Sequence, residues 1–127
     1  FSVPSNLYII GTMNTTDRSI GAADYAIRRR FAFVTLKADE KLLEMEYSNS
    51  LPLFKAVQKF IEKHTTDTLD MDDLMIGHSY FMNKDLSMAW EYEIRPLLVE
   101  YYKDGLLKCQ PEGNTIEEFI AKNVAEA

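Results

Sequence analysis

Two apolar runs separated by one helical stretch restrict the fold of this chain more than any other feature of its sequence. Residues 6–11 lack the alternation of a half-exposed strand, which predicts a strand buried on both faces of a parallel sheet. Residues 31–36 have the same character, and Ile20, Ala23 and Ile27 recur between the two runs at helical spacing. A helical connection implies parallel strands, and two such strands alone would leave unpaired edges and uncovered faces. We therefore expect further strands upstream, so that this sequence is a piece of a longer protein.

The second part of the sequence predicts a small helical assembly. Apolar residues recur at helical spacing in four segments: 39–47, 52–64, 86–103 and the residues after Thr115. Pro96 is expected to kink or divide the long third segment, and Gly105 suits its end. Thr115 and Glu118 form the capping-box pattern that opens the last helix.

Two segments between these helices are predicted to be non-helical. Residues 65–73 are polar and predict a loop, whereas residues 74–82 predict an extended segment. The expected fold class is α/β and predominantly helical. Residues 1–36 form the strand, helix, strand part, and residues 37–127 form the helical part.

Composition and charge narrow the class of protein. The chain has 14 Lys and Arg against 20 Asp and Glu, and its net charge of −6 disfavours a free-standing nucleic-acid binder, because phosphate contacts need clustered cations. Cys109 is the one cysteine, which excludes an internal disulfide and a multi-cysteine zinc site. His64 and His78 have no thiol beside them, and we expect no metal site. Residues 1–12 lack the features of a secretory signal and no apolar run is long enough to cross a bilayer, so we expect a cytoplasmic location and no membrane partner.

Polar residues follow the first predicted strand. Asn14 and Asp17 would lie at the carboxyl edge of a parallel sheet, where open α/β folds bind ligands, and an Asn there can orient a water molecule. Both side chains are also common in turns, where they serve structure alone. The predicted helix ends in Arg28, Arg29 and Arg30, but successive helical residues point about 100° apart, so at most two of these arginines can share one site.

The runs Met13–Ser19 and Asp24–Phe31 resemble the McrB family, the AAA+ GTPase subunit of methylcytosine-specific restriction systems. Residues 76–81 and 96–102 resemble the helical lid of that family. The resemblance implies that residues 1–36 are the last two parallel strands of an AAA+ P-loop NTPase sheet with the helix between them. It also implies that residues 37–127 are the helical lid subdomain.

The resemblance also implies roles for individual residues. Asn14 matches the sensor residue that helps to position the attacking water, and Arg29 and Arg30 match arginines that reach the nucleotide of a neighbouring subunit. Other positions resemble residues that help to shape the nucleotide site or the subunit boundary: Asp17, Arg18 and Asp24. His78, next to Gly77 in the lid motif, is a further candidate to lie near the nucleotide. Phosphoryl transfer depends on positioning and charge neutralisation, which is the chemistry that an Asn and a cation can supply.

Two motifs that hydrolysis requires are missing from the sequence. It has no G-x-x-x-x-G-K-[ST] phosphate loop and no apolar strand that ends in Asp-Glu. We therefore expect GTP or ATP with Mg²⁺ to bind to the full-length protein and no cofactor to bind to the isolated, inactive fragment. The implied partners are identical subunits in a ring and a nuclease subunit, with DNA contacted only through other domains or subunits.

Two other functions remain open at this stage. A related chaperone-like AAA+ ATPase would share the sensor and arginine arrangement but hydrolyse ATP. A non-enzymatic helical interaction module would use residues 1–36 as a short arm and bind a partner helix with its apolar faces.

Overall fold

A computed structural model describes residues 2–12, 29–65 and 74–127. Contacts divide the chain into two units, Phe1–Val34 and Thr35–Ala127. The described residues of the first unit form an irregular chain with turns at 5–6 and 29–30, and Tyr8 and Ile10 are exposed. The structure does not show the expected strands at 6–11 and 31–36. A strand needs a neighbour to bond its N–H and C=O groups, and the described residues contain no sheet that could supply one.

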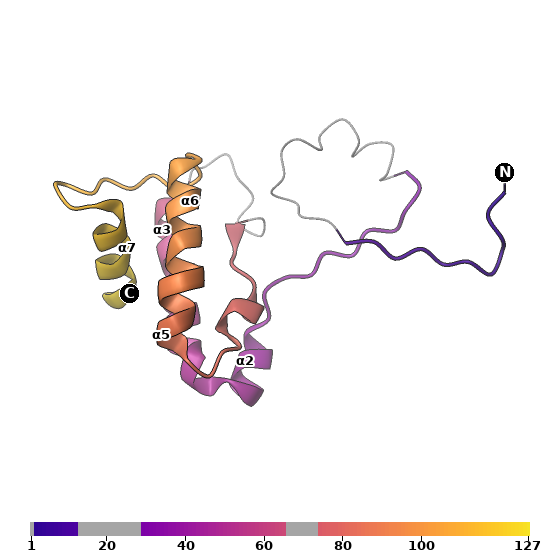
Figure 1. Ribbon diagram of the computed structural model, residues 1–127, viewed down its shortest axis with the longest axis horizontal. Helices are drawn as coiled ribbons and strands as arrows, with labels where there is room; N and C mark the ends of the chain where they lie inside the picture. Colours follow the sequence, from indigo (N-terminus) through magenta and orange to yellow (C-terminus); the bar gives the residue numbers. More distant parts are fainter. Residues whose placement is uncertain (1, 13–28, 66–73) are drawn as a thin grey trace. The chain divides into compact units, whose positions relative to one another are not determined.

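The second unit is helical, as predicted for the lid (Figure 1). Its elements in chain order are α2 (Glu40–Glu46), η2 (Ser48–Ser50), α3 (Leu51–His64), η3 (His78–Phe81), α5 (Leu86–Ala89), η4 (Trp90–Ile94), α6 (Arg95–Lys103) and α7 (Ile116–Ala125). The four predicted helical segments are thus confirmed. Most of the predicted loop at 65–73 lies outside the described residues. None of the helices in the described part of the chain is long and apolar enough to span a membrane.

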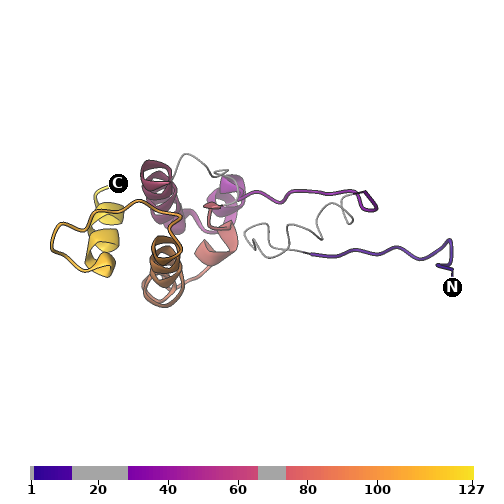
Figure 2. The same cartoon turned by 90° about the horizontal axis from the view of Figure 1, so that it is seen from above.

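The helices of this unit pack around one apolar core. Helices α5, η4 and α6 form one continuous rod beside α3, and α7 packs against both α3 and α6 (Figures 1 and 2). Helix α2 and the short turn η3 pack against each other and against α3. The rings of Phe54 on α3 and Phe81 on η3 are both fully buried and meet edge to face, with their centroids 5.1 Å apart. This aromatic pair therefore fixes η3 on the core.

The ends of the last two long helices follow the signals in the sequence. The Thr115 hydroxyl accepts from the Glu118 N–H at 3.2 Å, and the Glu118 carboxylate accepts from the Thr115 N–H at 3.1 Å, which is the predicted capping box of α7. Helix α6 ends before Gly105, whose φ is 72°. The Leu106 N–H donates to the Tyr101 carbonyl at 2.9 Å, which closes the turn in the way that favours glycine.

One segment differs from the expectation, and a second shows the form of an expected interruption. Residues 78–81 form a 3₁₀ turn instead of continuing an extended segment, and this turn directs Phe81 into the core. The long helix is interrupted by the π-helical turn η4, in which the Arg95 N–H donates to the carbonyl of Trp90, five residues earlier. Pro96 has no N–H, and its ring would clash with a carbonyl in a regular α-helical turn. The wider π turn directly before Pro96 is the form that the expected interruption takes.

Candidate functional site

The lid motif is connected to the first helix of the lid through His78. Nδ1 of His78 accepts a hydrogen bond from the backbone N–H of Asp39 at 3.1 Å. Asp39 is the N-cap of α2, and His78 is the first residue of η3. The two residues are 39 positions apart in the sequence, so the hydrogen bond joins the segment entering the lid to the Gly77–Phe81 motif.

This hydrogen bond also indicates which tautomer the neutral imidazole has. A ring nitrogen that accepts a hydrogen bond carries no proton, so the neutral ring has its proton on Nε2. His78 is partly buried. It therefore presents one acceptor to the backbone of Asp39 and one N–H donor on the other side of the ring.

The described residues include only some of the side chains that the sequence predicts for a nucleotide site. Arg29 and Arg30 lie in an exposed turn of the first unit, and Arg30 takes part in an interaction. His78 lies in the second unit. The other predicted positions fall outside the described residues: Asn14, Asp17, Arg18 and Asp24.

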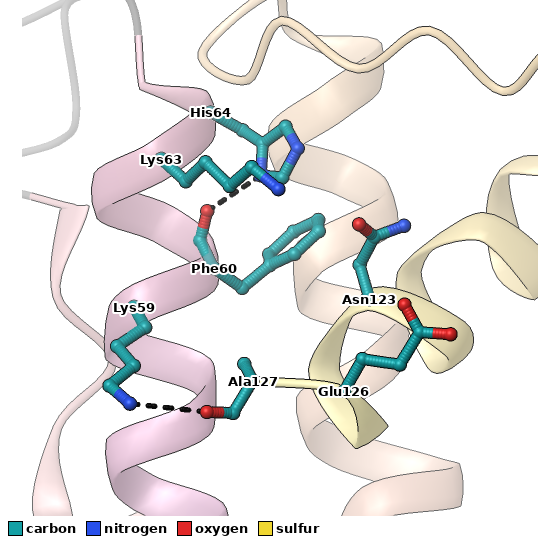
Figure 3. A pocket seen from close by; sticks show the side chains of 7 residues that line it. All are labelled: Lys59, Phe60, Lys63, His64, Asn123, Glu126 and Ala127. Atoms are coloured by element: carbon teal, nitrogen blue, oxygen red, sulfur yellow. Dashed lines mark hydrogen bonds between the residues drawn. The ribbon is translucent and has the colours of Figure 1, made fainter.

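A separate pocket of about 310 Å³ lies between α3 and α7 (Figure 3). Its lining residues are Lys59, Phe60, Lys63, His64, Asn123, Glu126 and Ala127. His64 packs its ring on Phe60, with centroids 4.4 Å apart, and its Nδ1 lies 2.8 Å from the Phe60 carbonyl oxygen. The Lys59 ammonium donates to the Ala127 carbonyl at 3.1 Å. The pocket thus combines two cationic side chains with one carboxylate on a floor of aromatic rings.

Sequence reasoning missed both the Asp39–His78 hydrogen bond and this pocket. Lys59 and Lys63 lie four residues apart on α3, and such a pair on a polar helical face is usually solvated. No pattern in the sequence shows that α7 packs over that face. The sequence does place an Asp at the N-cap position of α2, but it does not indicate which distant group accepts its N–H.

Burial changes the ionisation of two side chains in the lid. The partly buried phenol of Tyr101 has a raised pKa, first because burial disfavours the phenolate and second because Tyr80 lies nearby. Burial raises the pKa of the Cys109 thiol to about 11. Both groups are therefore neutral at pH 7. Within the described ranges, no cluster of His, Cys, Asp and Glu is arranged to hold a metal ion.

Helices packed on a single core, with an entry segment tied to a short motif turn, define a small α-helical domain. Comparison with known proteins agrees, because residues 51–110 match the family model described as McrB, alpha-helical lid domain. The chain is also 33% identical over 138 residues to the Type IV methyl-directed restriction enzyme EcoKMcrB subunit of Escherichia coli (strain K12). This chain belongs to the McrB family.

The alignment with the Escherichia coli subunit covers 91% of this chain and 30% of that relative. The chain therefore spans less than a third of the length of the relative. No solved structure matches the chain significantly.

Proposed function

We propose that this chain supplies the sensor residue, the trans-acting arginines and the lid of a GTP-hydrolysing AAA+ subunit in a modification-dependent restriction system. The order of two features carries the proposal. The motif at residues 13–31, which resembles the sensor and arginine region of the McrB family, is followed by a lid that matches the same family over residues 51–110. The name of the Escherichia coli relative, a methyl-directed restriction subunit, supports the same class of system.

The proposed chemistry assigns one task to each of three side chains. The Asn14 amide orients the water that attacks the γ-phosphate. Arg29 and Arg30 place positive charge near the nucleotide of the neighbouring subunit, where charge develops during phosphoryl transfer. An arginine supplied from a neighbour contributes about 10³–10⁵ in rate in well-studied NTPases, and it makes hydrolysis depend on assembly.

Other parts of the full-length protein complete the site in this proposal. The sequence has no phosphate loop and no strand ending in Asp-Glu, so another segment holds the phosphates and the Mg²⁺ ion that neutralises their charge. Asp17, Arg18 and Asp24 shape the site or the subunit boundary. Identical subunits form a ring, a nuclease subunit cuts the DNA, and the work takes place in the cytoplasm, where GTP is available.

The first test measures GTP hydrolysis by the full-length protein and its variants. Asn14→Ala and Arg30→Ala are each expected to lower kcat by at least about 10², because each removes a group that acts on the transition state. Arg28→Ala is the matched control, since the spacing of three adjacent arginines allows at most two to serve the site. Unchanged kcat in Asn14→Ala or Arg30→Ala would remove the assigned role.

Mixing two inactive variants tests whether the arginine acts on a neighbour. An Arg30→Ala subunit keeps its own Asn14, and an Asn14→Ala subunit keeps its own Arg30. If Arg30 acts in trans, mixed rings contain sites with both groups intact, and activity returns on mixing. Activity that stays absent at every mixing ratio would show that both groups belong to the same subunit.

The nucleotide is tested by competition. A GTPase of this family is expected to hydrolyse GTP in the presence of equal ATP, whereas preferential ATP hydrolysis would favour the chaperone-like AAA+ ATPase. The isolated 127-residue chain is expected to hydrolyse neither nucleotide, and measurable turnover by it would contradict that expectation.

A further inference from the structure

The N-cap of α2 is completed by a residue distant in sequence. The Asp39 carboxylate accepts from the Lys41 N–H at 2.9 Å, which satisfies one of the unpaired N–H groups at the helix start. The backbone N–H of an N-cap residue is often bonded by Glu or Gln at the third helical position, as Glu118 does for Thr115 in α7. In α2 this position is Leu42, which has no acceptor. Nδ1 of His78 takes its place.

Both sides of the Asp39–His78 hydrogen bond are held by the core. On one side, Leu43 of α2 is fully buried, and Ala38 packs against the core just before the bonded N–H. On the other side, the turn η3 that begins with His78 is anchored by fully buried Phe81 on Phe54. The bond therefore joins two segments that have little freedom to move apart.

The bonded segment is also the entry to the lid. The two units of the chain divide between Val34 and Thr35, and α2 begins at Glu40. Any rotation of the lid relative to the preceding unit must be absorbed by the backbone close to this division, because hinge motions are taken up by a few residues at element ends. The hydrogen bond to His78 fixes the last residue of the entry segment to the body of the lid.

We propose that His78 is a positioning residue, which acts on hydrolysis by fastening Asp39 to the lid motif and not by contact with the nucleotide. The proposal rests on the proposed function and assigns His78 a different role within it. Nδ1 carries that role, whereas a contact with the nucleotide would require Nε2, the nitrogen that bears the proton. The two roles therefore use opposite sides of one imidazole.

Two substitutions separate these sides. In His78→Asn the side-chain oxygen stands close to the position of Nδ1 and accepts from Asp39, but nothing replaces Nε2. In His78→Gln the amide extends to the position of Nε2, and the acceptor at Nδ1 is lost. His78→Ala removes both. Gly77→Ala is the neighbouring control, because a Cβ there meets only the Ser79 hydroxyl, at 3.6 Å.

Steady-state GTP hydrolysis by the full-length protein gives the first readout. A positioning role predicts that His78→Asn and Gly77→Ala keep kcat, while His78→Gln and His78→Ala lose about three- to tenfold in kcat, with KM for GTP unchanged, as expected from one hydrogen bond. A rise in KM in His78→Asn, with His78→Gln active, would overturn the proposal in favour of direct contact.

Amide hydrogen exchange in the 127-residue chain gives a readout that needs no nucleotide. The Asp39 amide is expected to exchange about three- to tenfold faster in His78→Ala and His78→Gln than in the wild type and His78→Asn. Equal exchange in all four proteins would overturn the proposal. A wild-type full-length protein that hydrolyses neither GTP nor ATP would overturn the proposed function and the kinetic role together, while the exchange rates would still decide whether His78 holds Asp39.

Discussion

Cys109 shows how the environment of a single residue determines its chemistry. The side chain is 8% exposed and belongs to the apolar core of the lid. The sequence alone excluded an internal disulfide, because no second cysteine is present. Burial adds a second property, since it disfavours the thiolate and raises the pKa of the thiol from its ordinary value of 9.0 to about 11. Cys109 is therefore a packing residue and a poor nucleophile at neutral pH.

This burial predicts slow alkylation of the native chain. At pH 8 the rise of the pKa from 9.0 to about 11 lowers the thiolate fraction by about a hundredfold. Iodoacetamide is expected to label Cys109 about a hundred times more slowly in the native chain than in urea, as measured by mass spectrometry over time. Equal rates in both conditions would show that the thiol is not buried.

The same thiol makes the stability of the fold decrease at alkaline pH. Its folded pKa is raised, so its contribution to the free energy of unfolding is fully present below about pH 9 and is lost as pH rises toward 11.

His64 illustrates what periodicity reveals about a residue. It completes the apolar stripe of α3, which predicts a half-buried packing role. The structure agrees, because His64 is partly buried and its ring contacts both Phe60 and Phe119, with centroids 4.4 and 5.7 Å apart. The sequence did not predict the contact between His64 on α3 and Phe119 on α7, since packing between helices depends on residues far apart in the chain.

At the scale of elements, the end of α6 depends on glycine. Gly105 has φ of 72°, a conformation that costs a residue with a Cβ about 1–2 kcal/mol. Gly105→Ala is expected to lower the free energy of unfolding by about that amount, measured by urea denaturation. Gly77→Ala has no such strain, with φ of −59°, and is expected to change stability by less than about 0.5 kcal/mol. Equal losses in both variants would contradict the role of the left-handed conformation.

The elements that sequence predicted best are those with local signals. The helices at 40–46, 51–64 and 116–125 follow from apolar spacing, Pro52 near a helix start and the Thr115–Glu118 pair. The 3₁₀ turn at 78–81 was not predicted, because it depends on the packing of Phe81 against Phe54, a contact between residues distant in sequence. The Asp39–His78 bond was missed for the same reason.

At the scale of the molecule, the lid contains its own core. All buried apolar residues of the described chain lie between Leu43 and Val124. A chain of residues 35–127 is therefore expected to fold alone, with a Tm within about 4 °C of the 127-residue chain by circular dichroism, since that difference corresponds to less than about 1 kcal/mol. Phe54→Ala in the short chain is the positive control, because it removes a fully buried ring and costs about 3–5 kcal/mol.

A Tm more than about 8 °C lower in the short chain would show that residues 1–34 stabilise the lid.

At this scale the sequence and the structure contribute different parts of the candidate site. The sequence supplies the motif with Asn14, Asp17, Arg18 and Asp24, which lie outside the described residues. The structure supplies the surroundings of His78, which no local pattern contains.

The π turn η4 is a position at which the chain can lose one residue without a change in the register of the helix that follows. Because the Arg95 N–H reaches back five residues to Trp90, the rod of α5 and α6 contains one residue more than a regular α-helix needs over this span. Loss of a single codon within Trp90–Ile94 would remove this extra residue and keep α6 in register with the core, while the Pro96 ring would then leave a kink in the rod. The same loss within α3 would rotate every later residue of that helix by about 100°.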